Sequence, residues 1–370
     1  MKKVIPVSFM LLFCILILLV QITLINQAKN TLPTAICFRS QDGMNVSFDE
    51  IKELKDVTAV AQRNATIATT YNDDNEKVNL WYTNENYFEV ANFKCKYGSF
   101  FEAKSGVEQN RFIVISNQLA LRYFKTDKVI GQSMLIDNQI YTICGVYEQK
   151  QALLNQLAQQ KLSTIYMPYQ SYTGKEPLLP QLILVKSNSQ FIKSAYDYVQ
   201  NQIPSYLNYD SVTNYNDILR LIRQTIRLSI AACGIVVLII LIILLIRQSK
   251  KSYQLYRMDG FTREFYKAIA LIGILVAVGI LTIFLTQFNF FLPADWTPKE
   301  NIFDLNFYKE QLKSVFQMKN TIMVYDPFLN YSYISMFTCG VLSIMLFLNF
   351  VVLLLLCIPI FTYLKKKFVK

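Results

Sequence analysis

The amino-acid sequence predicts an α-helical membrane protein with four transmembrane helices (1+3) and an α+β extracytoplasmic domain between helices 1 and 2. Three observations predict this fold. Four apolar runs contain no charged residue, one run opens the chain while three lie toward its end, and a long polar segment at 27–227 separates the first from the others. A transmembrane helix needs about 20 mostly apolar residues to cross about 30 Å of hydrocarbon, so each run can span a bilayer.

The runs divide the chain into three parts. They cover residues 4–25, 228–246, 268–288 and 334–361. Residues 1–26 are the predicted N-terminal transmembrane helix, 27–219 the extracytoplasmic domain, and 220–370 a stalk followed by a three-helix transmembrane unit. The spans of this last unit are joined by loops at 247–267 and 289–333, which fall on opposite sides of the membrane.

The first run is expected to be a retained membrane anchor. Lys2 and Lys3 ahead of apolar residues also occur in secretory signal peptides. The apolar core of a signal peptide is usually about 7–15 residues long, however, and the Gln-Ala-Lys-Asn sequence after this run is a poor cleavage site.

Charge sets the predicted orientation. The chain has a net charge of +11, yet residues 27–219 carry 18 Lys and Arg against 19 Asp and Glu. The basic excess lies close to the membrane, at Lys2, Lys3, Arg247, Lys250, Lys251, Arg257, Arg263, Lys267, Lys365, Lys366, Lys367 and Lys370. Because cytoplasmic loops are enriched in Lys and Arg, both termini and 247–267 are predicted to be cytoplasmic and the large domain extracellular. The charge thus reflects topology, and nucleic acid is not an expected partner.

Three arginines depart from this rule. Arg220, Arg223 and Arg227 precede the second span on its outer side, and their i, i+3, i+7 spacing places them on one helical face. One interpretation is a stalk helix continuous with the span, whose arginines extend to lipid headgroups. The other is an electrostatic contact with a substrate or with the stalk of a partner.

The sequence lacks the residues of common catalytic and metal sites. It has no histidine, which excludes Ser-His-Asp and Cys-His nucleophiles and His-based zinc or haem ligation. It also has no G-x-x-x-x-G-K-[ST] loop for nucleotide phosphates. Asp73, Asp74 and Glu76 are expected to form a solvated turn, so no catalysis, metal or cofactor is expected in this chain. At most one disulfide is expected among the outer cysteines, Cys37, Cys95 and Cys144.

The outer domain is predicted to mix strands and helices. Short β-type runs bounded by turn residues predict strands at 66–71, 111–115, 133–136, 140–146, 163–167 and 181–185. Helices are predicted at 47–55, 116–124 and 189–202. Ser47 and Ser116 are candidate N-caps, and Glu50 stands at the capping-box distance from Ser47. Gly98 and Gly131 are expected at turns that a Cβ disfavours.

An ordered series of motifs runs through this domain. The series is Tyr87-Phe88, Tyr97-Gly98-Ser99-Phe100-Phe101, Arg111-Phe112-Ile113-Val114-Ile115-Ser116, Leu119-Ala120, Tyr123-Phe124, Val129-Ile130-Gly131, Ile136, Ile140-Tyr141-Thr142-Ile143-Cys144-Gly145-Val146 and Ile165-Tyr166-Met167-Pro168. Its order and spacing resemble the extracytoplasmic core domain of MacB-type ABC transporter permeases. Most of these residues are expected to be core and turn positions rather than ligand contacts.

The 247–267 loop resembles the coupling region of FtsX-like permeases, where a basic helix leads to a glycine turn before the next span. A short helix parallel to the membrane is expected here, ended by Gly260, with Thr262 capping the next helix. By resemblance, a separate cytoplasmic subunit that binds ATP and Mg docks at Tyr253, Leu255, Tyr256, Arg257, Met258, Asp259, Gly260 and Phe261. The alternative is a basic loop that only fixes topology.

The end of the chain has two further features. The run 334–361 would measure roughly 42 Å at about 1.5 Å per residue, so it must tilt or project beyond the membrane. Asn349 inside it is expected to hydrogen-bond to a neighbouring helix. The loop 289–333 is longer than the usual family connection, and an amphipathic helix at 306–318 is expected at the membrane surface, or as a lid over a substrate entrance.

The resemblance implies a permease subunit of a mechanotransmission-type ABC transporter. It implies a dimer with a second copy or a related permease, a cytoplasmic ATPase, and export or expulsion of a peptide or an amphipathic antimicrobial compound. The short connection between Val146 and Ile165 favours a cell with one membrane, as in Gram-positive bacteria. The alternative is an FtsX-like regulatory membrane protein that activates an extracellular partner such as a cell-wall hydrolase. Removal of haem or lipid is a third possibility.

Overall fold

The structure is a computed structural model, and it describes residues 4–68, 76–101, 111–148, 163–186, 192–259, 263–285, 291–293, 297–298, 301, 304–310, 313 and 327–368. The chain divides into two compact units. The membrane unit comprises Met1–Asn26, Arg220–Leu292 and Met336–Lys370. The outer unit comprises Gln27–Leu219 and Pro293–Ser335.

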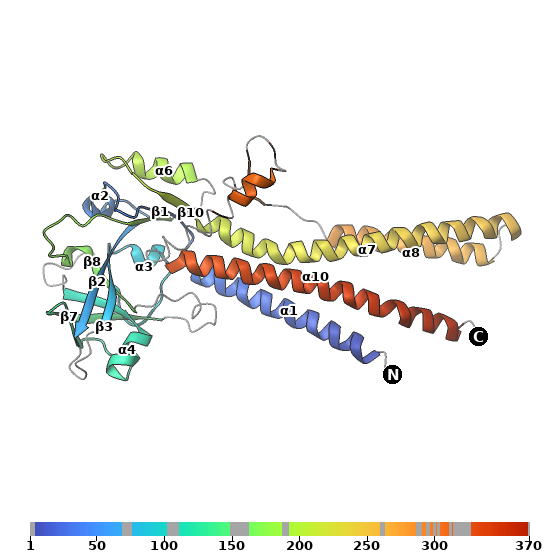
Figure 1. Ribbon diagram of the computed structural model, residues 1–370, viewed down its shortest axis with the longest axis horizontal. Coiled ribbons are helices and arrows are strands. Elements are labelled where there is room, and N and C mark those ends of the chain that lie inside the picture. The colour runs from blue at the N-terminus through green and yellow to red at the C-terminus, as the bar shows by residue number, and fades with distance from the viewer. Residues whose placement is uncertain are drawn as a thin grey trace. The chain divides into compact units, whose positions relative to one another are not determined.

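Four helices are long and apolar enough to cross a membrane. They are α1 (Val4–Thr31), α7 (Tyr215–Asp259), α8 (Arg263–Leu285) and α10 (Pro327–Phe368). In Figure 1, α7 and α10 run in one direction while α1 and α8 run in the opposite one, so consecutive spans alternate in direction. This 1+3 arrangement around an α/β domain confirms the predicted fold class.

α7 and α10 are much longer than a span. With 45 and 42 residues, they measure roughly 68 and 63 Å at about 1.5 Å per residue, about twice the hydrocarbon thickness. The short separate helix expected at the cytoplasmic loop is not formed, because residues 247–259 are the last turns of α7. No Gly or Pro occurs between Gly234 and Gly260, so nothing in the sequence interrupts the helix before Asp259.

The described part of the outer unit contains one ten-stranded sheet with strand order β10-β1-β9-β2-β3-β8-β5-β7-β4, while β6 pairs with β2 and β7. The strands are β1 (Ala35–Arg39), β2 (Val57–Ala68), β3 (Glu76–Thr83), β4 (Cys95–Gly98), β5 (Phe112–Ser116), β6 (Ser133–Ile136), β7 (Gln139–Tyr147), β8 (Ser163–Pro168), β9 (Leu182–Lys186) and β10 (Ser211–Asn214). The β3–β8 and β5–β7 pairs are parallel, and the remaining pairs are antiparallel. β2, β3, β7 and β8 are labelled within this sheet in Figure 1.

Both faces of the sheet are buried along β1, β5, β8 and β9. Because side chains alternate along a strand, Ile165 and Met167 of β8 enter the main hydrophobic core while Tyr166 between them faces the other side. The main core is completed by three helices, α2 (Phe48–Lys52), α4 (Asn117–Phe124) and α6 (Ile192–Gln200). The opposite face carries aromatic side chains, including those of α3 (Tyr87–Val90). The short 3₁₀ helix η2 spans Tyr169–Ser171.

The predicted caps and turns are present. Ser47 and Glu50 form the capping box, in which the Ser47 amide donates to Glu50 Oε2 (2.8 Å) and the Glu50 amide donates to Ser47 Oγ (3.2 Å). Ser116 caps α4 by accepting from the Leu119 amide at 3.1 Å. Gly98 has φ +72°, and a Cβ there would collide with the Cys144 carbonyl, so the position requires glycine.

Several predicted elements differ from the structure. β1, β3, β4 and β10 were not expected, and β2 begins at Val57 rather than at residue 66. In the outer loop, residues 305–310 and 313 are helical, whereas residues 314–318 of the expected helix lie outside the described residues, as do Asp73 and Asp74. The described outer cysteines, Cys37, Cys95 and Cys144, form no disulfide among the described residues.

Candidate functional site

The first turn of α7 is fixed to the sheet by a buried arginine. Asn214 Oδ1 accepts from the Asn216 amide at 3.1 Å, as a helix N-cap does. Tyr215, the first residue of α7, is fully buried, and its hydroxyl accepts from Arg39 Nη2 at 2.9 Å. Arg39 Nη1 also donates to Thr213 Oγ1 at 2.7 Å. Since the guanidinium is 4% exposed, removing either acceptor would leave a buried donor poorly satisfied.

An aromatic junction continues from Tyr215 through Phe328 and Phe93 to Tyr166, all within the outer unit. The ring centroids are 6.1 Å apart for Tyr215 and Phe328, 6.0 Å for Phe328 and Phe93, and 5.6 Å for Phe93 and Tyr166, each with an edge-to-face geometry. Phe328 is the second residue of α10. The first turns of α7 and α10 therefore pack on each other and on one face of the sheet. Burial raises the pKa of the Tyr166 hydroxyl well above its ordinary value, so the junction stays uncharged.

A cluster of hydrogen-bonded polar side chains, here called the polar knot, joins three helices of the membrane unit. Gln21 of α1 is fully buried, and its Nε2 contacts Thr225 Oγ1 of α7 at 3.2 Å, Ser343 Oγ of α10 at 2.7 Å and the Cys339 carbonyl at 3.2 Å. Ser343 Oγ donates to the Thr225 carbonyl at 2.9 Å, and Ser229 Oγ donates to the Ser343 carbonyl at 3.3 Å. These bonds hold α1, α7 and α10 in one register.

Sequence reasoning missed Gln21, although a signal was present, because it is the only amide side chain in the apolar run 4–25. The expectation for Asn349 was wrong. Its Nδ2 donates to the Met345 carbonyl of its own helix at 2.8 Å, not to a neighbouring helix. An amide at i can reach the carbonyl at i−4 without any tertiary partner, which is why sequence alone could not distinguish the two.

The three stalk arginines lie on α7, which is continuous with the second span. The Arg220 guanidinium stacks over the Phe291 ring at 4.4 Å, and Gln224 Oε1 accepts from the Phe291 amide at 3.0 Å. Arg223 and Arg227 are exposed. The structure thus distinguishes Arg220, which has a partner within the chain, from Arg223 and Arg227, which are exposed.

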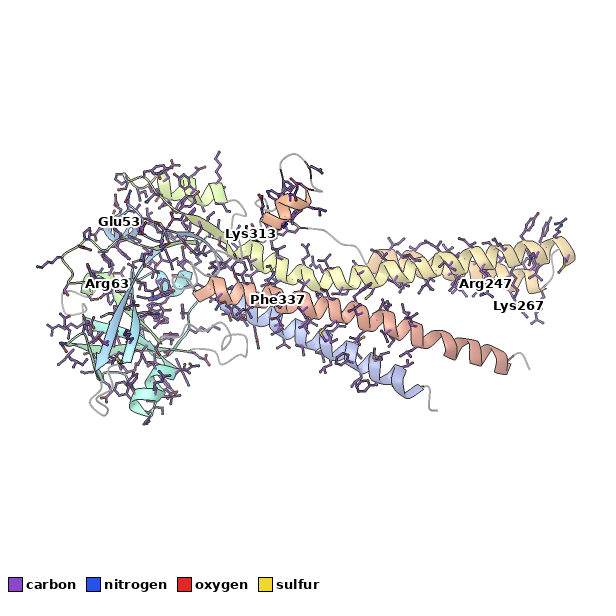
Figure 2. All side chains as sticks on the ribbon, viewed as in Figure 1. Glu53, Arg63, Arg247, Lys267, Lys313 and Phe337 are labelled. Carbon is purple, nitrogen blue, oxygen red and sulfur yellow. The ribbon has the colours of Figure 1, made fainter. Side chains whose placement is uncertain are left out.

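The predicted coupling residues that the structure describes lie in the last turns of α7. Tyr256 packs against Phe265 with ring centroids 5.7 Å apart, which closes the hairpin. Tyr253 and Met258 are 66% and 74% exposed, Arg257 is exposed and Leu255 is half-buried. Figure 2 shows the labelled Arg247 and Lys267 toward the same end of this hairpin. Asp259 is the last residue of α7, whereas Gly260 and Phe261 lie outside the described residues.

Comparison with known proteins gives three findings. The family model for the MacB-like periplasmic core domain matches residues 13–203. The chain is similar to the periplasmic region of MacB from Actinobacillus actinomycetemcomitans, at 15% identity over 52% of this chain and 94% of that one, with a TM-score of 0.39. It is also similar to the extracellular domain of the noncanonic ABC-type transporter YknZ from Gram-positive bacteria, at 18% identity over 46% of this chain and 91% of that one, with a TM-score of 0.35. No curated protein matches the chain.

Four candidate spans and one mixed α/β domain define a multi-pass membrane protein with an extracellular domain. The chain belongs to the MacB-like periplasmic core domain family. It is accordingly a permease component of an ABC-type transporter, a class that works with a partner ATPase. The resemblance seen in the sequence motifs is confirmed.

Proposed function

We propose that this chain is the permease of a mechanotransmission-type ABC transporter. A separate cytoplasmic subunit binds ATP and Mg, and closure of the ATPase pair moves the hairpin between α7 and α8. The observation that carries the proposal is the continuity of α7. One helix begins at Tyr215, held by Arg39 and the aromatic junction, and ends at Asp259 in the hairpin. An uninterrupted helix transmits axial and tilting displacement along its length better than a jointed one.

The hairpin offers a suitable docking surface for the ATPase. Tyr253, Met258 and Tyr266 are exposed beside the basic residues Arg257 and Arg263. Aromatic residues, Met and Arg are enriched at protein–protein interfaces, and these exceed what topology alone requires. Orientation by the positive-inside rule places this hairpin and both termini in the cytoplasm.

The transported substrate is proposed from the family resemblance. It is a peptide or an amphipathic antimicrobial compound, exported or expelled from the outer leaflet or the extracellular side by a dimer of this chain with a second copy or a related permease. The proposed location is the plasma membrane of a Gram-positive bacterium, with the 27–227 segment outside.

The test is purification of the tagged full-length chain from native membranes, followed by reconstitution with the ATPase that accompanies it. Arg257→Glu and Gly260→Pro are expected to lower substrate-stimulated ATP hydrolysis at least tenfold, because each disturbs the docking hairpin. Lys193→Glu, a charge reversal at an exposed position of α6, is the matched control and should leave stimulation unchanged. Full stimulation in both hairpin variants would contradict the coupling role.

A regulatory function is the other outcome of this test. If the complex contains the ATPase together with a cell-wall hydrolase, and deletion of residues 30–220 abolishes hydrolase activation without changing resistance to peptides, the chain acts as an FtsX-like activator. Recovery of the ATPase alone, with loss of resistance on deletion, supports transport.

A further inference from the structure

Two arginines on the outer part of the membrane unit are exposed and closely spaced. Arg223 and Arg227 lie four residues apart on α7, so their side chains share one helix face. None of the ion pairs among the described residues involves either side chain. Arg220, one turn earlier, is already occupied by the Phe291 ring. The pair therefore forms a concentrated positive charge with open hydrogen-bond donors.

The membrane unit cannot neutralise this charge from its own sequence. Its acidic residues are Asp259 and Glu264 alone. Asp259 follows Arg227 on the same helix at a distance of roughly 48 Å, taking about 1.5 Å per residue. A positive pair on the outer side also opposes the usual distribution of basic residues around a membrane protein. An anionic partner for this pair would therefore come from outside the membrane unit.

The position of the pair identifies the kind of anion. Arg227 stands directly before the apolar run 228–246, where a helix leaves the hydrocarbon and meets lipid headgroups. A guanidinium group binds two phosphate oxygens at once, and its stem can lie along apolar surface. Ile230 is 45% exposed and continues the same face, at i+7 from Arg223, toward the hydrocarbon. Two phosphate-binding groups therefore precede an apolar contact along α7. This order matches the phosphate headgroup and the acyl chain of a phospholipid.

We propose that Arg223, Arg227 and Ile230 form a binding site for a net-anionic phospholipid of the outer leaflet. The phosphate lies between the two guanidinium groups, and the first part of an acyl chain lies along Ile230. The bound lipid fixes the depth of α7 in the membrane. This role does not depend on the transport function proposed above, because it requires no ATPase and no transported substrate.

The experiment uses the full-length chain in vesicles of equal parts phosphatidylglycerol and phosphatidylcholine with identical acyl chains. A photo-cross-linking residue replaces Leu228, which is 42% exposed and adjacent to the pair, and the attached lipid is identified by mass spectrometry. Phosphatidylglycerol is expected to exceed phosphatidylcholine by about fivefold for each arginine, the ratio equivalent to about 1 kcal/mol per basic side chain near anionic lipid. Arg223→Gln with Arg227→Gln should return the ratio to that of the vesicle.

Two controls make the outcome decisive. Lys250→Gln with Lys251→Gln, an equal loss of charge at the other end of α7, should leave the ratio at residue 228 unchanged. A probe in place of Tyr253 should report the same ratio with and without the arginines, which shows that the variant is intact. Equal ratios at residue 228 in the wild type and the arginine variant would overturn the proposal. Loss of enrichment on adding millimolar glycerol phosphate would also overturn it, because the ligand would then be a soluble phosphoester.

Discussion

Gln21 illustrates how one side chain sets the packing of several helices. An amide that is fully buried among apolar helices has to satisfy its donors within the protein, and here its Nε2 lies within hydrogen-bond distance of α7 and α10 side chains and of an α10 carbonyl. The single residue thus helps to define the relative register of α1, α7 and α10, because its hydrogen bonds are directional and are lost when one helix shifts along another.

We expect Gln21→Leu to destabilise the membrane unit by about 1–2 kcal/mol, the loss of two or three interhelical hydrogen bonds at about 0.6 kcal/mol each. The free energy of unfolding in bicelles measures this effect. Thr23→Val is the control, since the Thr23 hydroxyl is exposed and donates only to the Leu19 carbonyl of its own helix. Equal stability of the two variants would contradict the role assigned to the knot.

Glu50 makes the outer unit sensitive to acid. The Ser205 hydroxyl donates to Glu50 Oε1 at 2.6 Å, and this bond, followed by that of the Ser47 amide, lowers the pKa of the carboxyl from its ordinary value of 4.5. A group whose pKa is lower in the folded state stabilises the fold above its unfolded pKa, and this contribution is lost as pH falls through the folded value.

The thermal midpoint of the outer unit in the full-length protein should therefore fall as pH decreases from 6 through about 4.5 and below. Glu50→Gln should flatten this part of the pH dependence, because the charged form that makes these bonds is absent. Ser205→Ala should reproduce part of the change. A pH profile identical in all three proteins would show that the capping box contributes nothing to acid stability.

At the scale of elements, the long helices depend on how their first turns are held. Tyr215 opens α7 and Phe328 lies in the first turn of α10, and the two rings contact each other. The structure therefore fixes both helices at one aromatic junction instead of at two separate points on the sheet. A displacement of the first turn of α7 therefore shifts the first turn of α10, and the reverse also holds.

Phe328→Ala should cost about 3 kcal/mol through the cavity it leaves, and Tyr215→Phe about 1–3 kcal/mol through loss of the acceptor for the buried Arg39 guanidinium. Hydrogen exchange of the β1 and β10 amides in the full-length protein measures both effects. Phe337→Ala is the matched control, because this α10 side chain is 71% exposed and labelled on the helix in Figure 2. Unchanged exchange in Phe328→Ala would exclude the junction as a structural anchor.

Elements with strong local signals could be predicted from the sequence, and those formed by tertiary pairing could not. The Ser47 and Ser116 caps and the Asp137-Asn138 hairpin turn, where both residues have positive φ, are local features. β3 has the sequence Glu-Lys-Val-Asn-Leu-Trp-Tyr-Thr, whose polar first half resembles a loop. It becomes a strand because it pairs along its length with β2 and β8. β4 is only four residues long, too short for a periodic signal.

The charged residues of the candidate site could be predicted from the sequence, whereas its aromatic junction could not. The basic hairpin and the stalk arginines were visible because charge beside apolar runs is easy to recognise. The junction of Arg39, Tyr215 and Phe328 was not, because it joins residues separated by more than a hundred positions in the chain. The beginning of the coupling helix was not recognised, since α7 has no break between span and hairpin, and Gly260, its predicted end, lies outside the described residues.

For the whole molecule, orientation in the membrane is the property on which every functional proposal depends. We propose that the hairpin and both termini lie on the cytoplasmic side, because α1 and α8 run opposite to α7 and α10. In intact cells, a membrane-impermeant maleimide should label Lys193→Cys and leave Lys250→Cys unlabelled until the cells are lysed. Background from the native outer thiols should be low, because burial raises the pKa of Cys95 and raises that of Cys144 to about 12, while Cys37 is fully buried. The opposite labelling pattern would invert the assigned topology.

The pairing of β1 with β10 has a consequence for the history of the protein. β1 follows α1 and β10 precedes α7, and Ile36 lies opposite Asn214 in an antiparallel ladder. The segment 27–219 therefore enters and leaves the outer unit through two adjacent strands, as inserted domains with neighbouring ends do, while residues 293–335 join the unit separately. Exchange of this segment for another with the same spacing of ends would keep the four helices if the replacement also kept the contacts with Phe328 of α10. Recombination at these two ends would join the same four membrane helices to a different extracellular domain.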